Sequence, residues 1–157
     1  MKKIFDQLAK KIITKEDLIF FIEEVNILQS FIFKNTRIPL SDRLNKKVEE
    51  DFKQYIKELE DQNLLSGSPN QQLSFFEDLK DYLQKIPQLK LEIAFSPPRS
   101  FLLAIKKWFR EKNGQEVILD ITVNPEIVGG ATIEYQGRYR DFSLLEKLNK
   151  SISQIRL

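Results

Sequence analysis

The sequence predicts an α+β protein, with an N-terminal helical bundle over residues 1–86 and a small β-α-β-β-α domain over residues 87–157. In the first half, apolar residues recur every three or four positions, as they do in amphipathic helices. In the second half, they alternate with polar residues, as they do in half-buried strands. Four of the five glycines lie after residue 113, where turns between such strands are needed.

Four helices are expected in the first half. The first follows the apolar stripe of residues 4–13. The second begins at Lys15, because Thr14 and Asp17 resemble a capping box. Its apolar residues cover more than one face, so it needs neighbours on several sides, and Pro39 limits its C-terminal end.

A third helix is expected to begin at Ser41, a good N-cap residue, and to run without interruption to Leu59. A loop at residues 66–70 precedes a fourth helix, which ends near Ile86. Four helices with short connections form a bundle. The apolar stripe of the third helix consists of Leu44, Val48, Phe52, Tyr55 and Leu59.

The second half begins with a strand over residues 89–95. A helix follows, with Pro98 suited to its first turn and Asn113-Gly114 to its end. A second strand spans residues 117–123. Because a helix separates these two strands, they are expected to pair in parallel.

A tight connection over residues 124–130 leads to a third strand at residues 131–135 and then to a short return strand at residues 138–140. The last helix is expected to start at Ser143, which forms a standard capping box with Glu146. Its apolar face carries Leu144, Leu148, Ile152 and Ile155.

The composition excludes several kinds of chemistry. The chain of 157 residues has no Cys and no His, which excludes disulfides, thiolate nucleophiles, the usual zinc sites and the Ser-His-Asp triad. Its 25 basic and 23 acidic residues give a net charge of +2, well below that of a typical nucleic-acid-binding domain. The longest apolar run, Leu18–Ile22, is too short to span a bilayer. A soluble cytoplasmic protein is expected.

Two pairs of residues suggest chemistry but have simpler interpretations. Gly129-Gly130 lacks the spacing of a phosphate-binding loop and leads into a strand, so a turn or bulge is favoured. Asp141 and Ser143 could be an acid and a nucleophile. No His is present to activate the serine, however, and helix capping explains both residue types.

Acidic pairs such as Glu23-Glu24 are interpreted as a solvated surface, since the chain lacks the pattern of a calcium-binding loop. No metal site and no cofactor is therefore expected. A carboxylate- or lysine-based enzyme is a third possible function, but the sequence supplies no evident pair of acids for it.

A basic and aromatic cluster in the second half raises an alternative function, that of an RNA-binding accessory protein. Helical spacing places Trp108 with Phe101 in the buried stripe, and Lys106 and Lys107 on the opposite side. The aromatic strand pattern of an RNA-recognition motif is missing from residues 137–142. RNA binding is therefore retained only as the alternative.

The segment Val117–Lys150 resembles the C-terminal signature of the delta subunit of F-type ATP synthases, a family related to the mitochondrial oligomycin-sensitivity-conferring protein. That signature is a strand, a D-P-x-[LI]-[IV]-G-G turn, another strand, and D-x-S followed by L-x-x-L. Here the turn is NPEIVGG at residues 124–130, and the second part is DFSLLEKL at residues 141–148. The family-motif residues are Pro125, Gly129, Gly130, Asp141, Ser143, Leu144 and Leu148.

Two features depart from the family pattern. Asn124 stands where the family usually has Asp, which preserves an Asx turn but loses a charge. The family also has a six-helix N-terminal bundle, whereas four helices are predicted here.

The resemblance implies a non-catalytic stator connector. In the family, the helical domain binds N-terminal helices of the alpha subunits, and the C-terminal domain binds the C-terminal helices of the b-subunit stalk. The catalytic head is thereby held against rotor torque during proton-driven ATP synthesis. The resemblance also implies a peripheral position at the cytoplasmic face of the inner (plasma) membrane. Candidate interface anchors are Phe20, Phe31, Phe33 and Trp108, because aromatic residues dominate interface energetics.

Overall fold

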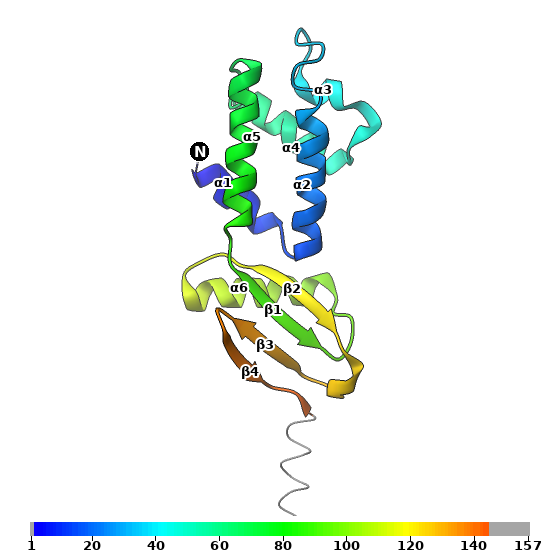
Figure 1. Ribbon diagram of the computed structural model, residues 1–157, viewed down its shortest axis with the longest axis vertical. Helices are drawn as coiled ribbons and strands as arrows, with labels where there is room; N and C mark the ends of the chain where they lie inside the picture. Colours follow the sequence, from blue (N-terminus) through cyan, green and yellow to red (C-terminus); the bar gives the residue numbers. More distant parts are fainter. Residues whose placement is uncertain (1, 145–157) are drawn as a thin grey trace, which may run out of the picture. The chain divides into compact units, whose positions relative to one another are not determined.

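The computed structural model describes residues 2–144 and confirms the α+β class (Figure 1). It contains two compact units. The helical unit is Glu16–Lys85, and the sheet unit joins Met1–Lys15 to Ile86–Leu157. The structure thus divides the chain differently from the expected bundle over residues 1–86, because the first helix belongs to the sheet unit. Within the described residues, no helix is both long and apolar enough to cross a bilayer.

The helical unit is built from amphipathic helices whose apolar sides are buried together. Its longest helices lie side by side in Figure 1, and the ammonium of Lys80 joins them by donating to Asn26 Oδ1 (3.1 Å) and Gln29 Oε1 (2.7 Å). The ring of Phe21 contacts Phe52 edge-on, with 5.3 Å between centroids. Its elements are α2 (Lys15–Gln29), α3 (Leu40–Leu44), the 3-10 turn η1 (Asn45–Lys47), α4 (Glu50–Asp61) and α5 (Pro69–Gln84).

The expected third helix is wrong as a continuous element. The chain is extended at Val48 (φ −133°, ψ 164°) and at Glu49, which separates α3 from α4. The N–H of Glu49 donates to Glu24 Oε1 at 2.7 Å instead of to a helical carbonyl. Both pieces still bury their apolar side chains, so the stripe predicted from the sequence survives the interruption.

The ends of neighbouring helices also differ from the expectation. Ser41 lies inside α3 and is not its N-cap; its hydroxyl and the N–H of Leu40 donate to the carboxylate of Glu60, each at 2.5 Å. Helix α2 stops at Gln29, before the expected limit near Pro39. The loop between α2 and α3 is held by Arg43, whose guanidinium donates to backbone carbonyls on that loop.

Glu24 is a buried acid in the helical unit, with 5% of its surface exposed. Burial raises the pKa of this carboxyl above its ordinary value of 4.5, and the nearby charges of Glu49 and Asp51 raise it further. The hydrogen bond from the Glu49 N–H opposes these effects. Glu24 therefore fixes the break between α3 and α4 while its charge opposes folding.

The sheet unit has a mixed four-stranded sheet in the order β2-β1-β3-β4. Strands β1 and β2 pair in parallel, as the sequence predicted, and Leu89 lies opposite Leu119. Strand β1 also pairs with β3, and β3 with β4, in antiparallel fashion. The elements of this unit are α1 (Lys2–Lys11), β1 (Gln88–Ile93), α6 (Arg99–Asn113), β2 (Ile118–Val123), the 3-10 turn η2 (Pro125–Ile127), β3 (Ala131–Tyr135) and β4 (Arg138–Asp141).

Helix α6 lies against one face of this sheet (Figure 1). Alternating residues of β1 supply the buried side of the sheet, because successive side chains of a strand point to opposite faces. The buried core of the unit consists of Ile13, Leu89, Leu91, Ile93, Leu102, Phe109, Val117 and Leu119. The opposite face of the sheet is polar and is lined by Lys90, Glu92, Asp120, Thr122, Thr132, Glu134 and Tyr139.

The orientation of α6 differs from the prediction. Phe101 and Trp108, expected in the buried stripe, are 47% and 52% exposed. Lys106, expected on the outer side, is 3% exposed and lies between Leu102 and Phe109 on the buried side. The rule that apolar residues mark the buried face fails here because a lysine fills a buried position with specific acceptors around it.

Those acceptors belong to the C-terminal end of α1. The ammonium of Lys106 donates to the carbonyl of Ala9 at 2.6 Å and to that of Ile12, and it lies 3.7 Å from Glu116 Oε2. Helix ends leave carbonyls without intrahelical donors, and a cation satisfies them well. Next to this contact, the N–H of Leu119 donates to the carbonyl of Ile13 at 2.9 Å. These bonds attach α1 and the residues that follow it to α6 and β2.

Lys106→Met should destabilise the protein by about 3 kcal/mol, because it leaves buried carbonyls without their cation and Glu116 with Arg110 as its remaining cationic partner. Urea unfolding measures this loss, and hydrogen exchange should show faster opening of α1. The neighbouring exposed residue provides a matched control, since Lys107→Met should change stability by about 0.5 kcal/mol or less. Equal effects of the two variants would contradict the assigned role of Lys106.

Glu24→Gln should raise the free energy of unfolding at pH 7 and leave it nearly unchanged at pH 4. A folded-state pKa above 4.5 means that the protonated acid stabilises the fold at low pH and that this contribution is lost as the pH rises through the raised value. Glutamine keeps an acceptor for the Glu49 N–H but carries no charge. Urea unfolding at both pH values tests this, with the exposed Glu23→Gln as control.

Candidate functional site

The family-motif residues form a turn that begins where β2 ends. The side chain of Asn124 accepts from the N–H of Glu126 at 3.0 Å, which is the expected Asx turn. Its amide also donates to Glu92 Oε1 at 2.6 Å. The other oxygen of Glu92 accepts from Thr132 Oγ at 3.2 Å. One carboxylate on β1 therefore ties the start of the turn to β3.

This arrangement explains why asparagine suits position 124. The amide of Asn124 is both an acceptor for the turn and a donor to Glu92. An ionised aspartate would keep the first bond, but it has no donor and would repel the carboxylate of Glu92. Asn124 lacks the negative charge of the aspartate that is usual in the family, and the carboxylate of Glu92 on the neighbouring strand lies beside it.

The middle of the turn is tightly wound. Pro125 occupies the first position of η2, where its missing N–H does no harm. Val128 has φ +66° and ψ −36°, and the N–H of Gly129 donates to the carbonyl of Ile127 at 2.7 Å. A β-branched residue at positive φ, inside a three-residue turn, is strained. The strained backbone at Val128 turns the chain so that the following glycine pair returns to the sheet.

The two halves of the motif touch each other. The N–H of Leu144 donates to the carbonyl of Gly129 at 2.8 Å. Gly130 has φ +81°, and a Cβ there would overlap the carbonyl oxygen of Phe142 and lie 3.0 Å from Ser143 Cα. A Cβ on Gly129 would lie 2.8 Å from Leu144 Cδ1. The absence of side chains at the glycine pair thus lets residues 142–144 pack directly against it. This contact explains why the two halves of the family motif occur together.

Asp141 and Ser143 stabilise the second half of the motif. Asp141 Oδ1 accepts from the N–H of Ser143 at 2.7 Å. Ser143 is 2% exposed, so a substrate cannot reach its hydroxyl. The structure therefore brings the turn residues Pro125, Gly129 and Gly130 together with Asp141, Ser143 and Leu144 at the end of β4. Leu148 and the capping partner Glu146 lie outside the described residues.

The remaining surface offers little for the alternative functions. Within residues 2–144, no three acidic side chains come together as metal ligands. The open face of the sheet, which stacks bases in an RNA-recognition motif, carries Glu92, Asp120 and Glu134 here. The carboxylates of Asp120 and Glu134 pair with Lys15 and Lys90 at 3.0 and 3.1 Å, so these lysines are already engaged, which argues against binding of a phosphate backbone there.

Sequence reasoning missed Glu92, Thr132 and Lys106. Glu92 and Thr132 stand at outward positions of alternating strands, where surface residues are the ordinary interpretation. Their partner Asn124 gave one usable signal, because a departure from the family pattern at a charged position invites a search for a compensating residue. Lys106 gave no such signal, since its acceptors are backbone carbonyls.

The fold and the turn together define an α+β protein whose family motif stabilises the backbone. Comparison with known protein families shows that residues 3–155 match the family model described as ATP synthase delta (OSCP) subunit. The chain therefore belongs to the ATP synthase delta (OSCP) subunit family, which confirms the resemblance given by residues 117–150. Members of this family are peripheral-stalk subunits of F-type ATP synthases.

A relative at the sequence level carries the same description. The ATP synthase subunit delta of Xanthobacter autotrophicus (strain ATCC BAA-1158 / Py2) is 44% identical over 46 residues. These residues make up 29% of this chain and 23% of the relative, so the match spans less than a quarter of that relative's length.

Gly130→Ala should destabilise the protein by about 3 kcal/mol, because it combines a positive φ with overlap against the backbone of residues 142–143. Gly114→Ala is the matched control: Gly114 also has a positive φ, +72°, but open space surrounds its Cβ position, so about 1 kcal/mol is expected. Urea unfolding of both variants compares them directly. Equal losses would mean that the two halves of the motif do not meet.

Proposed function

We propose that this protein is a non-catalytic connector in the peripheral stalk of an F-type ATP synthase. It links the N-terminal helices of the alpha subunits to the C-terminal helices of the b subunit and resists rotor torque. It is peripheral, held at the cytoplasmic face of the inner (plasma) membrane through its partners. The observation that carries the proposal is the contact between the two halves of the family motif, in a chain that matches the family from residue 3 to residue 155.

The helical unit has a surface suited to helices of the alpha subunit. Ile19, Phe20 and Ile27 of α2 are 51%, 49% and 38% exposed. Helical spacing puts Glu16 and Glu23 on the same side, so the exposed strip combines apolar and acidic side chains. Such a strip suits an amphipathic helix that carries basic residues beside its apolar face. Phe20, an anchor candidate from the sequence, is at its centre.

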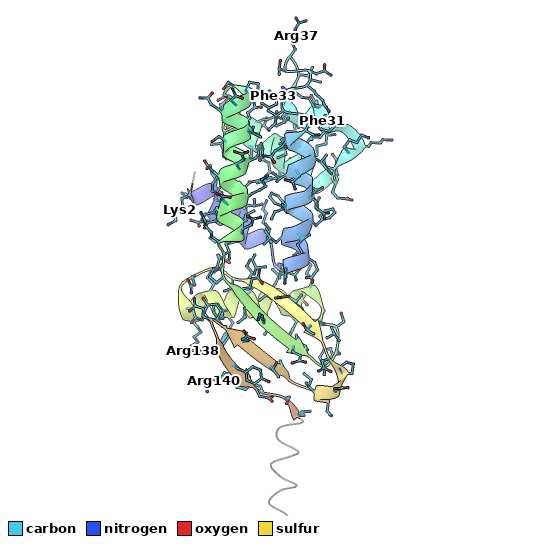
Figure 2. The ribbon with its side chains drawn as sticks, viewed as in Figure 1. Lys2, Phe31, Phe33, Arg37, Arg138 and Arg140 are labelled. Carbon is cyan, nitrogen blue, oxygen red and sulfur yellow. The ribbon has the colours of Figure 1, made fainter. Side chains whose placement is uncertain are left out.

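The other anchor candidates lie elsewhere. Phe31 and Phe33 are near one end of the helical unit (Figure 2), where Phe33 is 58% exposed and Lys34 lies over the ring of Phe31 at 4.7 Å. The sheet unit supplies the second attachment in this proposal. Arg138 and Arg140 are exposed on β4, which is an edge strand of the sheet (Figure 2).

Binding of both partners is the direct test. Immobilised full-length protein should retain a peptide of the alpha-subunit N-terminus and a C-terminal segment of the b subunit, both taken from the same organism. Retention of neither would overturn the proposal. Phe20→Asp should weaken the alpha peptide about tenfold or more, since a charge replaces a central aromatic contact.

The same experiment has an internal control. Phe20→Asp should leave binding of the b segment unchanged, because the substitution lies in the other unit. Phe95→Asp, at a similarly exposed phenylalanine of the sheet unit (59%), should leave the alpha peptide unaffected. Loss of both partners with either variant would indicate unfolding, which circular dichroism detects.

A further inference from the structure

The outer side of α6 is unusually apolar for a surface helix. We define the α6 outer face as Phe101, Leu103, Ala104, Lys107 and Trp108. Phe101, Leu103 and Trp108 are each about half exposed, at 47%, 47% and 52%. Helical spacing aligns Phe101, Ala104 and Trp108 along one line, with Leu103 and Lys107 along a second. Ala104, on the first line, is small and lets another backbone approach closely.

A cavity of about 290 Å³ adjoins the second line, between α6 and the end of α1. It is of a size to hold an aliphatic side chain, and its entrance is basic. The ammonium of Lys106 is already engaged with α1, and Arg110 pairs with Glu116 at 2.9 Å. The lining residues are Lys10, Leu103, Ala104, Lys106, Lys107 and Arg110.

The charge of the surroundings points to an acidic partner. The sheet unit has sixteen basic and nine acidic residues, whereas the helical unit has nine and fourteen. At the cavity, Lys107 lies 4.0 Å from Glu111 in an exposed pair, which is worth little and exchanges readily for a better partner. Lys10 is exposed on α1. Two exposed lysines therefore line the cavity.

We propose that the α6 outer face binds an acidic amphipathic helix of a partner protein. A Leu or Ile of that helix enters the cavity, carboxylates one turn away pair with Lys10 and Lys107, and its remaining apolar side rests on Phe101 and Trp108. The proposal rests on the proposed connector function and assigns one of its surfaces. A helix fits better than a lipid or nucleic-acid surface, because the carboxylate of Glu111 beside Lys107 repels the phosphate groups of both.

Site-specific photo-crosslinking in the assembled ATP synthase tests this. Benzoylphenylalanine at position 103 or 108 should crosslink to a partner segment that has Asp or Glu within one turn of Leu or Ile. The same group at position 95 is the control and should not crosslink to that segment. Crosslinks to lipid, to nucleic acid or to a basic segment, or no crosslink at all, would overturn the assignment.

This outcome is separable from failure of the connector function. If the chain co-purifies with the synthase but positions 103 and 108 give no acidic-segment crosslink, the surface is wrong and the function stands. If the chain is absent from the synthase, the function itself fails.

Charge reversal provides a second measurement. Lys107→Glu should weaken binding of the crosslinked segment, made as a peptide, by about tenfold at low salt, and a Lys-for-acid change in the peptide should restore it. Lys57→Glu, an exposed lysine of α4, is the matched control and should have no effect. Unchanged binding with Lys107→Glu would count against the proposed pairing. An unchanged melting temperature shows that the variant is folded.

Discussion

The architecture of the sheet unit depends on one buried cation. Lys106 comes from the middle of α6, its carbonyl acceptors Ala9 and Ile12 come from the chain start, and Glu116 precedes β2. A buried ammonium is very unfavourable without partners, so the three segments must meet for the unit to fold. This requirement explains how a helix from residues 2–11 becomes part of a unit that otherwise begins at residue 86.

The family motif works by a similar principle, since the space or hydrogen-bonding group in one segment is filled or paired by a residue of another segment. Gly130 leaves room that only the backbone of Phe142 and Ser143 fills, and Glu92 has acceptors that Asn124 and Thr132 satisfy. None of these residues needs to touch a substrate. The motif therefore fixes the backbone at one end of the sheet through contacts between separate segments, which suits the proposed connector.

Sequence patterns predicted most of the elements because they report local periodicity. The alternation in β1 and β2, the parallel pairing and the return strand β4 follow from such patterns and from the intervening helix. The break at Val48 and Glu49 was missed, because the apolar spacing continues across it and its cause is a distant acid, Glu24. The resemblance to the family located the motif, but the sequence did not show that its two halves touch.

The errors on α6 have a single origin. The largest apolar side chains of that helix, Phe101 and Trp108, were placed inside because size and hydrophobicity usually indicate burial. The available interior is instead taken by Leu102, Phe109 and the aliphatic stem of Lys106, whose charged end is satisfied by α1.

Helix α6 buries Lys106 and exposes Trp108, and both features are explained if each face of the helix has a binding partner. The inner partner is α1, whose free carbonyls need a cation. Exposed aromatic residues beside a cavity are best explained by a second helix supplied from outside the chain.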